Sequence, residues 1–447
     1  ALCELTTWVY PAHEGAALPD PDYPYIDLSA AMRAQEVAET LQVLGPALDR
    51  IDARIRRRAL RELDRRIWQP FLGRGDFWWL WLQPGRTHLN NWTAVCSGGV
   101  LVAALAALGH DPERQARVVG KAAWSLGFFR DTFGEAGSLD EGAGYWAYGV
   151  SYYAMAAERL AARTGGRMDL LADPRWREIA QFPARVNLYD DTFVNFSDCA
   201  PQVTTIPGWL AWLGRRMEVP ALEAWAARLL GEQGGHGARN RHLPYVLRTL
   251  FWMEAASGPL IVGGGRGRPL SAFLPDVQWL VARADPSDDA LILAVKGGHN
   301  DESHNHNDGG SFIVHYRREP LIAELGAPTY TRQFFSATRY ENIAARSLGH
   351  SVPFVNGQEQ HAGRERAARV LAQGDGSLSL DLAGFYPPEA NLLSLRRDVA
   401  LHRDGNEGHI TLSDHAAFTA DGAALALPLL TADRAAEVLG PGHARIT

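Results

Sequence analysis

Apolar residues recur every three or four positions through the first half of the chain, the spacing that places them on one face of a helix. The helical pattern begins near Leu28, and helix-length apolar segments bounded by Gly, Pro or Asp continue to about Ala256. Within the first segment, Gly45-Pro46 predicts a break between two helices. Such a series of amphipathic helices favours an (α/α) toroid or solenoid, although no fixed-period sequence repeat is present.

Beyond Gly258 the apolar period changes to two, which is typical of half-buried strands. We therefore predict an α+β multidomain protein. Its N-terminal (α/α) toroid would occupy residues 1–257, and a glycine-rich linker would occupy residues 258–275. Residues 276–447 would form antiparallel stacked sheets or a β-sandwich. The chain ends soon after a β segment, so we expect the last sheet to be incomplete.

Composition narrows the classes of protein that the chain can belong to. It has 447 residues, of which 46% are hydrophobic and 21% charged, ordinary values for a soluble globular protein. No apolar run reaches the roughly 18 residues of a spanning helix. The formal net charge of −7 argues against a general nucleic-acid binder but allows an anionic substrate, because local charge decides binding. We expect neither a nucleic acid nor a membrane as partner, and the sequence does not indicate the oligomeric state.

The segment ESHNHNDGGSF, Glu302–Phe312, gathers side chains that can do chemistry. His304 and His306 alternate just before a predicted strand, so their imidazoles share one face. Two such imidazoles can bind a metal, or one can bind it while the other transfers a proton. With Glu324 and His350, His306 would complete a two-imidazole, one-carboxylate set that is usual for zinc. The alternative is a polar loop whose histidines cap the sheet.

Two motifs of the helical half place polar side chains where helices are expected to start. Asn90 and Asn91 are adjacent amides in HLNNW, suited either to capping or to binding. In DEGAGYWAYG, Tyr145 follows a flexible Gly-Ala-Gly stretch, from which its side chain can project into a cleft, and Tyr148 shares its helix face. Tyr152, farther along, is more simply explained as core.

These motifs together resemble the heparinase II/III-like polysaccharide lyases. HNHNDGGSF, EPLIAELG and TRYENIAARSLGHSVPFVNGQEQ carry the resemblance, and NNW and DEGAGYWAYG precede them in the expected order. The resemblance extends from about residue 30 to 420 and implies a toroid followed by antiparallel sheets. It implies cleavage of an anionic, uronate-containing polysaccharide (heparin, heparan sulfate, hyaluronan, chondroitin or alginate) by β-elimination. It also implies a secreted or periplasmic bacterial enzyme, although no signal peptide is visible.

The resemblance gives individual residues catalytic roles. Asn91 would neutralise the uronate carboxylate, whose charge opposes loss of the neighbouring C5 proton. Tyr145 would be both base and acid when that proton and O4 lie on one side of the ring, whereas His304 would be the base and Tyr145 the acid when they lie on opposite sides. Further residues are expected to contact the substrate: Asn90, Trp92, Tyr148, Arg339 and Tyr340.

The resemblance also implies one divalent metal ion. His306, Glu324 and His350 match the family's ligands, although some relatives have Asp where this chain has Glu324. That difference leaves the identity of the metal open, with zinc the first choice and manganese or calcium the alternatives. The ion is expected to fix the loops near the cleft and not to attack the substrate.

Three other functions stay open at this point. A zinc hydrolase of the metallo-β-lactamase type is suggested by HNHND, but Gly309 stands where that motif has its final His, and the long helical half has no counterpart there. A uronyl C5-epimerase would abstract the same proton and return it without expelling O4. A non-catalytic sugar-binding protein is disfavoured by the joint presence of Asn91, Tyr145 and two histidines.

Overall fold

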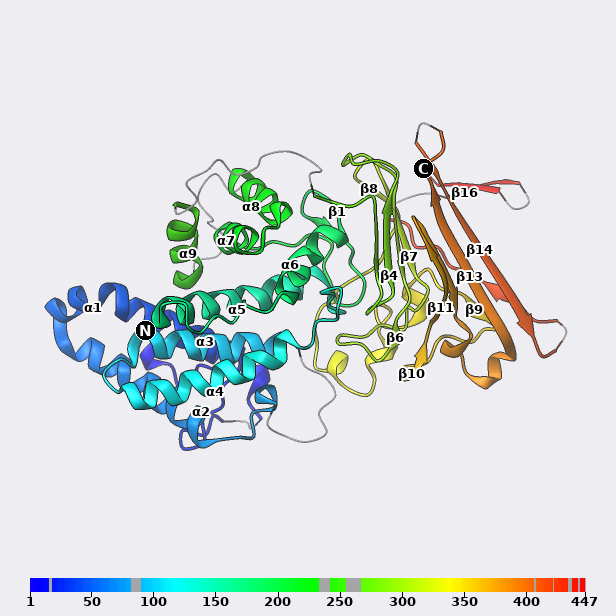
Figure 1. Cartoon of the computed structure of the whole chain (residues 1–447). Coiled ribbons are helices and arrows are strands. Elements are labelled where there is room, and N and C mark those ends of the chain that lie inside the picture. The colour runs from blue at the N-terminus through cyan, green and yellow to red at the C-terminus, as the bar shows by residue number, and fades with distance from the viewer. Residues whose placement is uncertain are drawn as a thin grey trace. The chain divides into compact units, whose positions relative to one another are not determined.

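The computed structural model divides the chain into two compact units (Figure 1). It describes residues 1–15, 18–81, 90–232, 242–254, 267–405, 407–420, 422–432, 436–440 and 443–446. The first of the two units, here called the helical unit, comprises Ala1–Phe133, Tyr145–Arg177 and Thr205–Val262. The second, here the β unit, comprises Gly134–Gly144, Glu178–Thr204 and Gly263–Thr447. Two stretches of the helical half therefore belong to the β unit.

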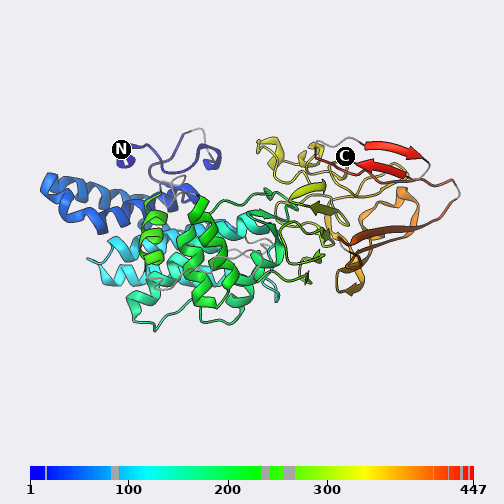
Figure 2. The ribbon, with the colours of Figure 1, turned by 90° about the horizontal axis from the view of Figure 1, so that it is seen from above.

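Helices build most of the first half of the chain, as its apolar period predicts. The helices are α1 (Leu28–Leu63), α2 (Gln69–Gly73), α3 (Asn91–Ala107), α4 (Pro112–Arg130), α5 (Gly142–Thr164), α6 (Arg175–Val186), α7 (Pro207–Met217), α8 (Pro220–Glu232) and α9 (Leu243–Glu254). The N-terminal segment before α1 is irregular and lies against the helices of this unit (Figure 2). Among the described residues, no helix is both long and apolar enough to cross a membrane.

The predicted helix break at Gly45-Pro46 is wrong in its position. Helical structure continues through Pro46, and the chain leaves helical geometry at Asp52, whose φ is −166° and ψ 119°. The Asp52 carboxylate accepts a hydrogen bond from the Arg54 backbone N–H at 2.8 Å, as a helix-capping residue does. A new helical arm thus begins at Asp52 because its side chain satisfies a backbone donor that the helix start leaves unpaired.

Glycines let α3 and α5 pack closely. A Cβ added at Gly98 of α3 would lie 2.9 Å from the Tyr152 carbonyl oxygen of α5. One added at Gly149 of α5 would lie 3.3 Å from the Cβ of Asn91. Both distances are shorter than ordinary side-chain contacts, so larger residues would push the helices apart. This packing fixes the start of α3 beside the first turns of α5.

Two antiparallel sheets form the core of the β unit. The first has the order β3-β4-β5-β7-β8 and the second the order β11-β12-β13-β14, and they appear in Figure 1 as two layers. The strands of the first are β3 (Ser271–Leu274), β4 (Trp279–Arg283), β5 (Ile292–Lys296), β7 (Phe312–Tyr316) and β8 (Glu319–Ile322). Those of the second are β11 (Arg369–Gly374), β12 (Ser377–Asp381), β13 (Leu392–His402) and β14 (His409–Phe418).

Short two-stranded pairings complete this unit. They join β1 (Asn187–Tyr189) to β2 (Thr192–Phe193), β6 (His299–Asn300) to β10 (Gly363–Ala367), β9 (Phe354–Val355) to β15 (Leu425–Ala426) and β16 (Ala436–Gly440) to β17 (His443–Ile446). The predicted antiparallel β region is therefore confirmed. Of the predicted linker, residues 258–266 lie outside the described residues, and β3 occupies Ser271–Leu274 in the rest. The predicted domain limits themselves stay a prediction.

The apolar faces of the two large sheets pack on each other. Leu280 and Leu293 from the first sheet and Leu380 and Val399 from the second belong to one buried cluster. Their exposed fractions do not exceed 2%, so each contributes roughly 1.5–3 kcal/mol of burial energy. The period-two pattern of the sequence is thus explained by strands that bury alternate side chains between two layers.

A buried arginine ties this sandwich to the glycines that follow HNHND. The Arg397 side chain of β13 is fully buried and donates to the carbonyl oxygens of Gly310 at 2.7 Å and Ser351 at 3.0 Å. It also pairs with the Asp414 carboxylate of β14 at 2.6 Å. A Cβ at Gly309 would overlap the ring of Phe385. The loop that carries the two histidines is therefore pressed directly onto the sandwich.

The close fit of Gly309 gives a stability prediction. Gly309→Ala should lower the free energy of unfolding by about 1–3 kcal/mol, because its methyl group overpacks the Phe385 ring. Thermal unfolding measures the change. Gly120→Ala in α4 is the matched control, since nothing lies within 4 Å of its added Cβ and Ala is the better helix former. Equal melting temperatures for Gly309→Ala and the unmutated protein would contradict the predicted overpacking.

Candidate functional site

One buried carboxylate of the β unit holds two histidines. Asp198 lies 2.8 Å through Oδ2 from His304 Nδ1 and 2.8 Å through Oδ1 from His306 Nε2. Its side chain is completely buried, whereas that of His304 is 17% exposed. Asp198 comes from the segment Glu178–Thr204, far in sequence from the histidines but in the same unit. The carboxylate therefore orients both imidazoles from behind and leaves one of them partly open to solvent.

Asp198 remains ionised in this position. Burial by itself would raise the pKa of its carboxyl, but the hydrogen bonds from His304 and His306 and the charge of Arg339 outweigh burial and hold that pKa far below its usual range. Arg339 Nη2 lies 3.1 Å from Asp198 Oδ2. A permanent negative charge thus faces both imidazoles and stabilises N–H donors on their inner sides.

The second nitrogen of His304 also faces a carboxylate. Its Nε2 lies 3.3 Å from Oε1 of Glu141, a buried residue that precedes α5. Tyr330 stacks on the His304 ring with centroids 5.9 Å apart, and its hydroxyl lies 3.0 Å from Nδ1. His304 has a φ of +56°, an uncommon conformation for a residue other than glycine. The imidazole is thus held by neighbours on both sides, an arrangement suited to proton transfer.

The predicted substrate contacts Arg339 and Tyr340 lie beside this histidine. Arg339 donates from Nε to the carbonyl oxygen of Asn305 at 3.0 Å, and its guanidinium lies 3.9 Å from the centroid of the Phe334 ring. The Tyr340 hydroxyl accepts a hydrogen bond from Asn305 Nδ2 at 3.0 Å. The structure therefore brings both residues to the His304 loop.

A possible metal-binding triad lies on the inner side of the same loop. Ligand atoms of His306, Asp308 and His350 all lie within 4.8 Å of one another, and the three side chains are buried. His306 Nδ1 and Asp308 Oδ2 make no hydrogen bond within the described part of the chain. Buried polar atoms without partners are costly, and a divalent cation would satisfy them. The donor set of two imidazoles and a carboxylate fits the ion that the sequence predicts.

The carboxylate of this triad is not the one predicted from sequence. Glu324 is hydrogen-bonded instead, with Oε2 at 2.5 Å from His350 Nδ1 and Oε1 accepting from the Ser311 hydroxyl. Burial lowers the pKa of His350, but the charge of Glu324 and its hydrogen bond outweigh burial and raise that pKa above its usual value. Glu324 thus holds the imidazole of His350, and its role as a ligand stays a prediction.

Lys296 supplies a positive charge next to this triad. Its ammonium lies 2.7 Å from Asp308 Oδ1 and 2.8 Å from Glu302 Oε2, and all three side chains are almost fully buried. Burial lowers the pKa of Lys296, but the two carboxylates outweigh burial and raise it. Burial also raises the pKa of Glu302, to about 7. The lysine therefore balances carboxylates that would otherwise be unpaired charges in the interior.

The remaining predicted catalytic residues lie in the helical unit. Asn91 is the first residue of α3 and is 3% exposed, and Tyr145 is partly exposed in the first turn of α5. Asn90 is the cap of α3, since its side chain accepts from the Trp92 backbone N–H at 3.0 Å. Burial raises the pKa of Tyr148 well above its usual value. Tyr152 is buried, as expected of core.

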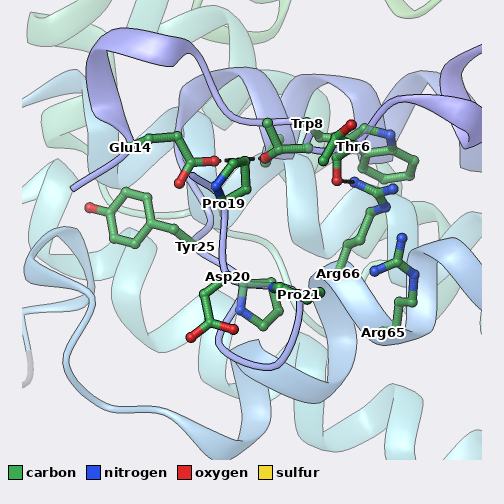
Figure 3. Close-up of a pocket in the computed structure, with 12 residues that line it drawn as sticks. Thr6, Trp8, Glu14, Pro19, Asp20, Pro21, Tyr25, Arg65 and Arg66 are labelled. Carbon is green, nitrogen blue, oxygen red and sulfur yellow. Dashed lines mark hydrogen bonds between the residues drawn. The ribbon is translucent and has the colours of Figure 1, made fainter. Parts of the chain in front are cut away.

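Figure 3 shows a pocket of about 170 Å³ in the helical unit. Its walls come from the N-terminal segment, from α1 and from the π-helical turn Asp64–Trp68 that follows it, and they include Trp8, Glu14, Asp20, Tyr25 and Arg65. None of the predicted catalytic, binding or metal-binding residues lines it. It therefore has no part in the site assembled from the motifs.

Several residues of the site were missed by sequence reasoning. Asp198, Glu141 and Tyr330 reach His304 from three separate segments, and no local motif marks Asp198 or Tyr330. Asp308 carried a signal, because it continues the alternation of His304 and His306. Lys296 carried one too, since it is one of only two lysines in the chain and ends an apolar strand.

Comparisons with known proteins support the family resemblance. Residues 266–424 match the family model of the heparinase II/III-like C-terminal domain. The fold is similar to a crystal structure of heparinase III, with 12% identity, a TM-score of 0.60, and 92% of this chain and 58% of that one covered. It is also similar to the heparan sulfate lyase HepC from Pedobacter heparinus, with 14% identity, a TM-score of 0.55, and 87% and 54% covered. No curated protein matches the sequence.

These likenesses establish the fold. The helical region followed by antiparallel sheets matches the toroid and β-sandwich of heparinase III, so the predicted fold class is confirmed. The chain spans somewhat more than half the length of these solved relatives.

Metal binding by single variants should distinguish the Asp308 carboxylate, which belongs to the triad, from the Glu324 carboxylate, which is hydrogen-bonded to His350. His306→Ala and His350→Ala should each abolish binding of one divalent ion per chain, measured by elemental analysis after dialysis against zinc. Asp308→Asn should do the same because Asp308 completes the triad. Glu324→Gln should weaken the affinity only about 10–100-fold, as loss of a supporting partner does. Loss of the metal in Glu324→Gln but not in Asp308→Asn would instead make Glu324 the ligand.

Proposed function

We propose that this protein is a polysaccharide lyase that cleaves an anionic, uronate-containing polysaccharide by β-elimination and leaves a 4,5-unsaturated uronate at the new end. The observation that carries the proposal is the His304 side chain, held between Asp198 and Glu141 in a domain that matches the heparinase II/III-like family model. The fold shared with heparinase III and a heparan sulfate lyase adds support. Such substrates lie outside the cell, so we also propose a secreted or periplasmic protein.

The reaction explains why these residue types are needed. A base removes the C5 proton, the electron pair forms the C4–C5 double bond, and the bond from C4 to O4 breaks as an acid protonates O4. Charge builds up on the uronate carboxylate during this step, and a donor that meets it there lowers the barrier. The proposal gives this role to the Asn91 amide. Because Asn90 already caps α3, Asn91 is the amide of the pair that can serve the substrate.

The proton-transfer groups follow from their positions and hydrogen bonding. Desolvation raises the pKa of Tyr148 well above its usual value, which disfavours it as a base, and Tyr145 stands in the first turn of α5; both tyrosines are partly exposed, and Tyr145 is proposed as the one that exchanges protons. The ionised Asp198 accepts from His304 Nδ1 and thereby selects the form in which Nε2 takes or gives the proton. We propose that His304 is the base and Tyr145 the acid on substrates whose C5 proton and O4 lie on opposite sides, and that Tyr145 does both otherwise.

The triad His306, Asp308 and His350 is proposed to hold one divalent ion, zinc before manganese or calcium. When bound, the ion would supply a cross-link of high charge density between the histidine loop and the segment of His350. The side chains themselves do the rest: His306 and His304 share Asp198, so a fixed His306 also fixes the carboxylate that orients His304.

The first test of function is the product. The unmutated protein should release unsaturated uronate, detected by its ultraviolet absorbance, from at least one of heparan sulfate, hyaluronan, chondroitin or alginate. Tyr145→Phe and His304→Ala should each lower the rate at least ~100-fold, a usual share for acid–base groups. Tyr148→Phe is the matched control and should keep its rate within about tenfold. Exchange of the C5 proton without chain cleavage would identify an epimerase and contradict the lyase.

A second test separates the two asparagines. Asn91→Ala should lower kcat far more than it changes KM, since the carboxylate needs most neutralisation as the transition state develops. Asn90→Ala should instead cost about 1 kcal/mol of stability through the lost cap, with little change of kcat. Steady-state kinetics on one defined oligosaccharide, together with thermal unfolding, measure both. A raised KM with unchanged kcat in Asn91→Ala would leave Asn91 without a catalytic role.

A further inference from the structure

The irregular N-terminal segment brings a histidine to the start of α3. The 3-10 turn Pro11–His13 places the His13 ring 4.7 Å from the ring of Trp92, centroid to centroid. Tyr10 meets His13 edge-on at 5.6 Å, and the ring of Trp78 lies 5.1 Å from that of Trp92, centroid to centroid. All four rings belong to the helical unit. Three segments that are distant in sequence thus build one aromatic cluster next to Asn91.

A buried carboxylate fixes the orientation of His13. Asp27 is the cap of α1, where it accepts from the Ala30 N–H at 2.8 Å, and its other oxygen accepts from the Tyr10 N–H at 3.0 Å. That oxygen also lies 2.7 Å from His13 Nδ1. Asp27 is completely buried, while the His13 side chain is 28% exposed. The inner nitrogen of the imidazole is therefore tied to Asp27, and Nε2 makes no hydrogen bond to any of the described residues.

The cluster combines the features of a sugar platform. Tyr10 is 45% exposed, and Trp78 and Trp92 are partly exposed, although large aromatic rings gain most from complete burial. Rings with an open face suit the apolar C–H face of a pyranose, and an adjacent ring nitrogen or hydroxyl suits its hydroxyl groups. A tie for the N-terminal segment alone would need only the contact between Asp27 and the backbone of Tyr10.

The cluster is also continuous with a proposed catalytic residue. Trp92 follows Asn91 in α3, and the Cβ of Asn91 packs against Gly149 of α5, one turn beyond Tyr145. The two side chains leave successive positions of α3 in different directions, so a sugar on Trp92 would lie near the helix start that carries the amide proposed to meet the uronate carboxylate.

We propose that Tyr10, His13, Trp78 and Trp92 form a pyranose-binding subsite that holds the sugar next to the one being cleaved, with His13 Nε2 hydrogen-bonding that sugar. This inference rests on the proposed lyase function for the identity of its ligand. It assigns the N-terminal segment to substrate binding, a role that no sequence motif indicates. His13 acts here by binding and takes no part in proton transfer.

The test is calorimetric binding of size-fractionated heparan sulfate, hyaluronan, chondroitin and alginate oligosaccharides. All binding variants are made in a Tyr145→Phe background, so that cleavage does not consume the ligand. His13→Asn keeps a donor near the place of Nδ1 and hence the tie to Asp27, but removes the ring and Nε2. It should weaken binding about 3–10-fold without lowering the melting temperature, and Trp92→Ala should weaken binding at least as much.

Two controls separate binding from folding. Tyr23→Ala removes an exposed aromatic ring from the same N-terminal segment, but one that packs on Arg74 and not on the cluster, and should leave the affinity unchanged. The double variant His13→Asn, Trp92→Ala should weaken binding by less than the product of the single effects, because the two rings touch.

The outcomes distinguish this inference from the proposed function. Release of unsaturated uronate by the unmutated protein, with unchanged affinity in His13→Asn, overturns the subsite alone. Oligosaccharide binding that is weakened by His13→Asn, without any cleavage by the unmutated protein, overturns the lyase and supports the subsite. The subsite is overturned if the protein binds none of the oligosaccharides. It is also overturned if His13→Asn lowers the melting temperature without weakening binding, and His13 then serves only to anchor the N-terminal segment.

Discussion

The shared carboxylate of Asp198 is the interaction on which the arrangement of the histidine loop depends. One oxygen meets His304 and the other meets His306, so a single anion orients an imidazole that is partly exposed and one that is completely buried. Its charge survives burial because the two imidazoles and Arg339 surround it with donors. The unusual backbone conformation of His304 is tolerated because these contacts over-determine it. A displacement of the buried His306 would therefore be passed to the partly exposed His304 through the Asp198 side chain.

The β unit confines several charges to a small buried volume. Lys296 lies between Glu302 and Asp308, and Glu324 is hydrogen-bonded to His350, so each of these buried carboxylates has a polar partner beside the histidine loop. A buried charge without its partner would lower the free energy of unfolding by several kcal/mol. Substitution of a single member of the set should therefore destabilise the protein. The sandwich supports it mechanically, since Arg397 bonds the Gly310 carbonyl and the Phe385 ring fills the space beside Gly309. Packing and electrostatics thus fix the same loop.

In the helical unit, helix caps and close helix packing position side chains that are proposed to meet the substrate. The Asn90 side chain caps the start of α3, and the adjacent Asn91 packs beside Gly149. Asp27 caps α1 and at the same time anchors His13 and the backbone of Tyr10. In both places the residue that caps the start of a helix also sets the position of a side chain proposed to meet the substrate. Stability and proposed function are therefore carried by neighbouring atoms.

The sequence by itself determined the fold class, because periods of 3.6 and 2 are local properties that burial of one face imposes on each element. It also marked the loop of His304 and His306 by the residue types that gather there, although His304 lies in a turn with a φ of +56° and Asp198, not an extended chain, brings the two imidazoles together. The position of the α1 break was beyond it, because the Asp52 side chain created a new helix start and the proline did not end the old one. Only the tertiary structure decided that Asp198 joins the two histidines, that Asp308 lies close to both His306 and His350 while Glu324 is hydrogen-bonded to His350, and that His13 reaches Trp92. Those contacts join segments far apart in sequence, and their distances follow from how sheets and helices pack, which no local pattern encodes.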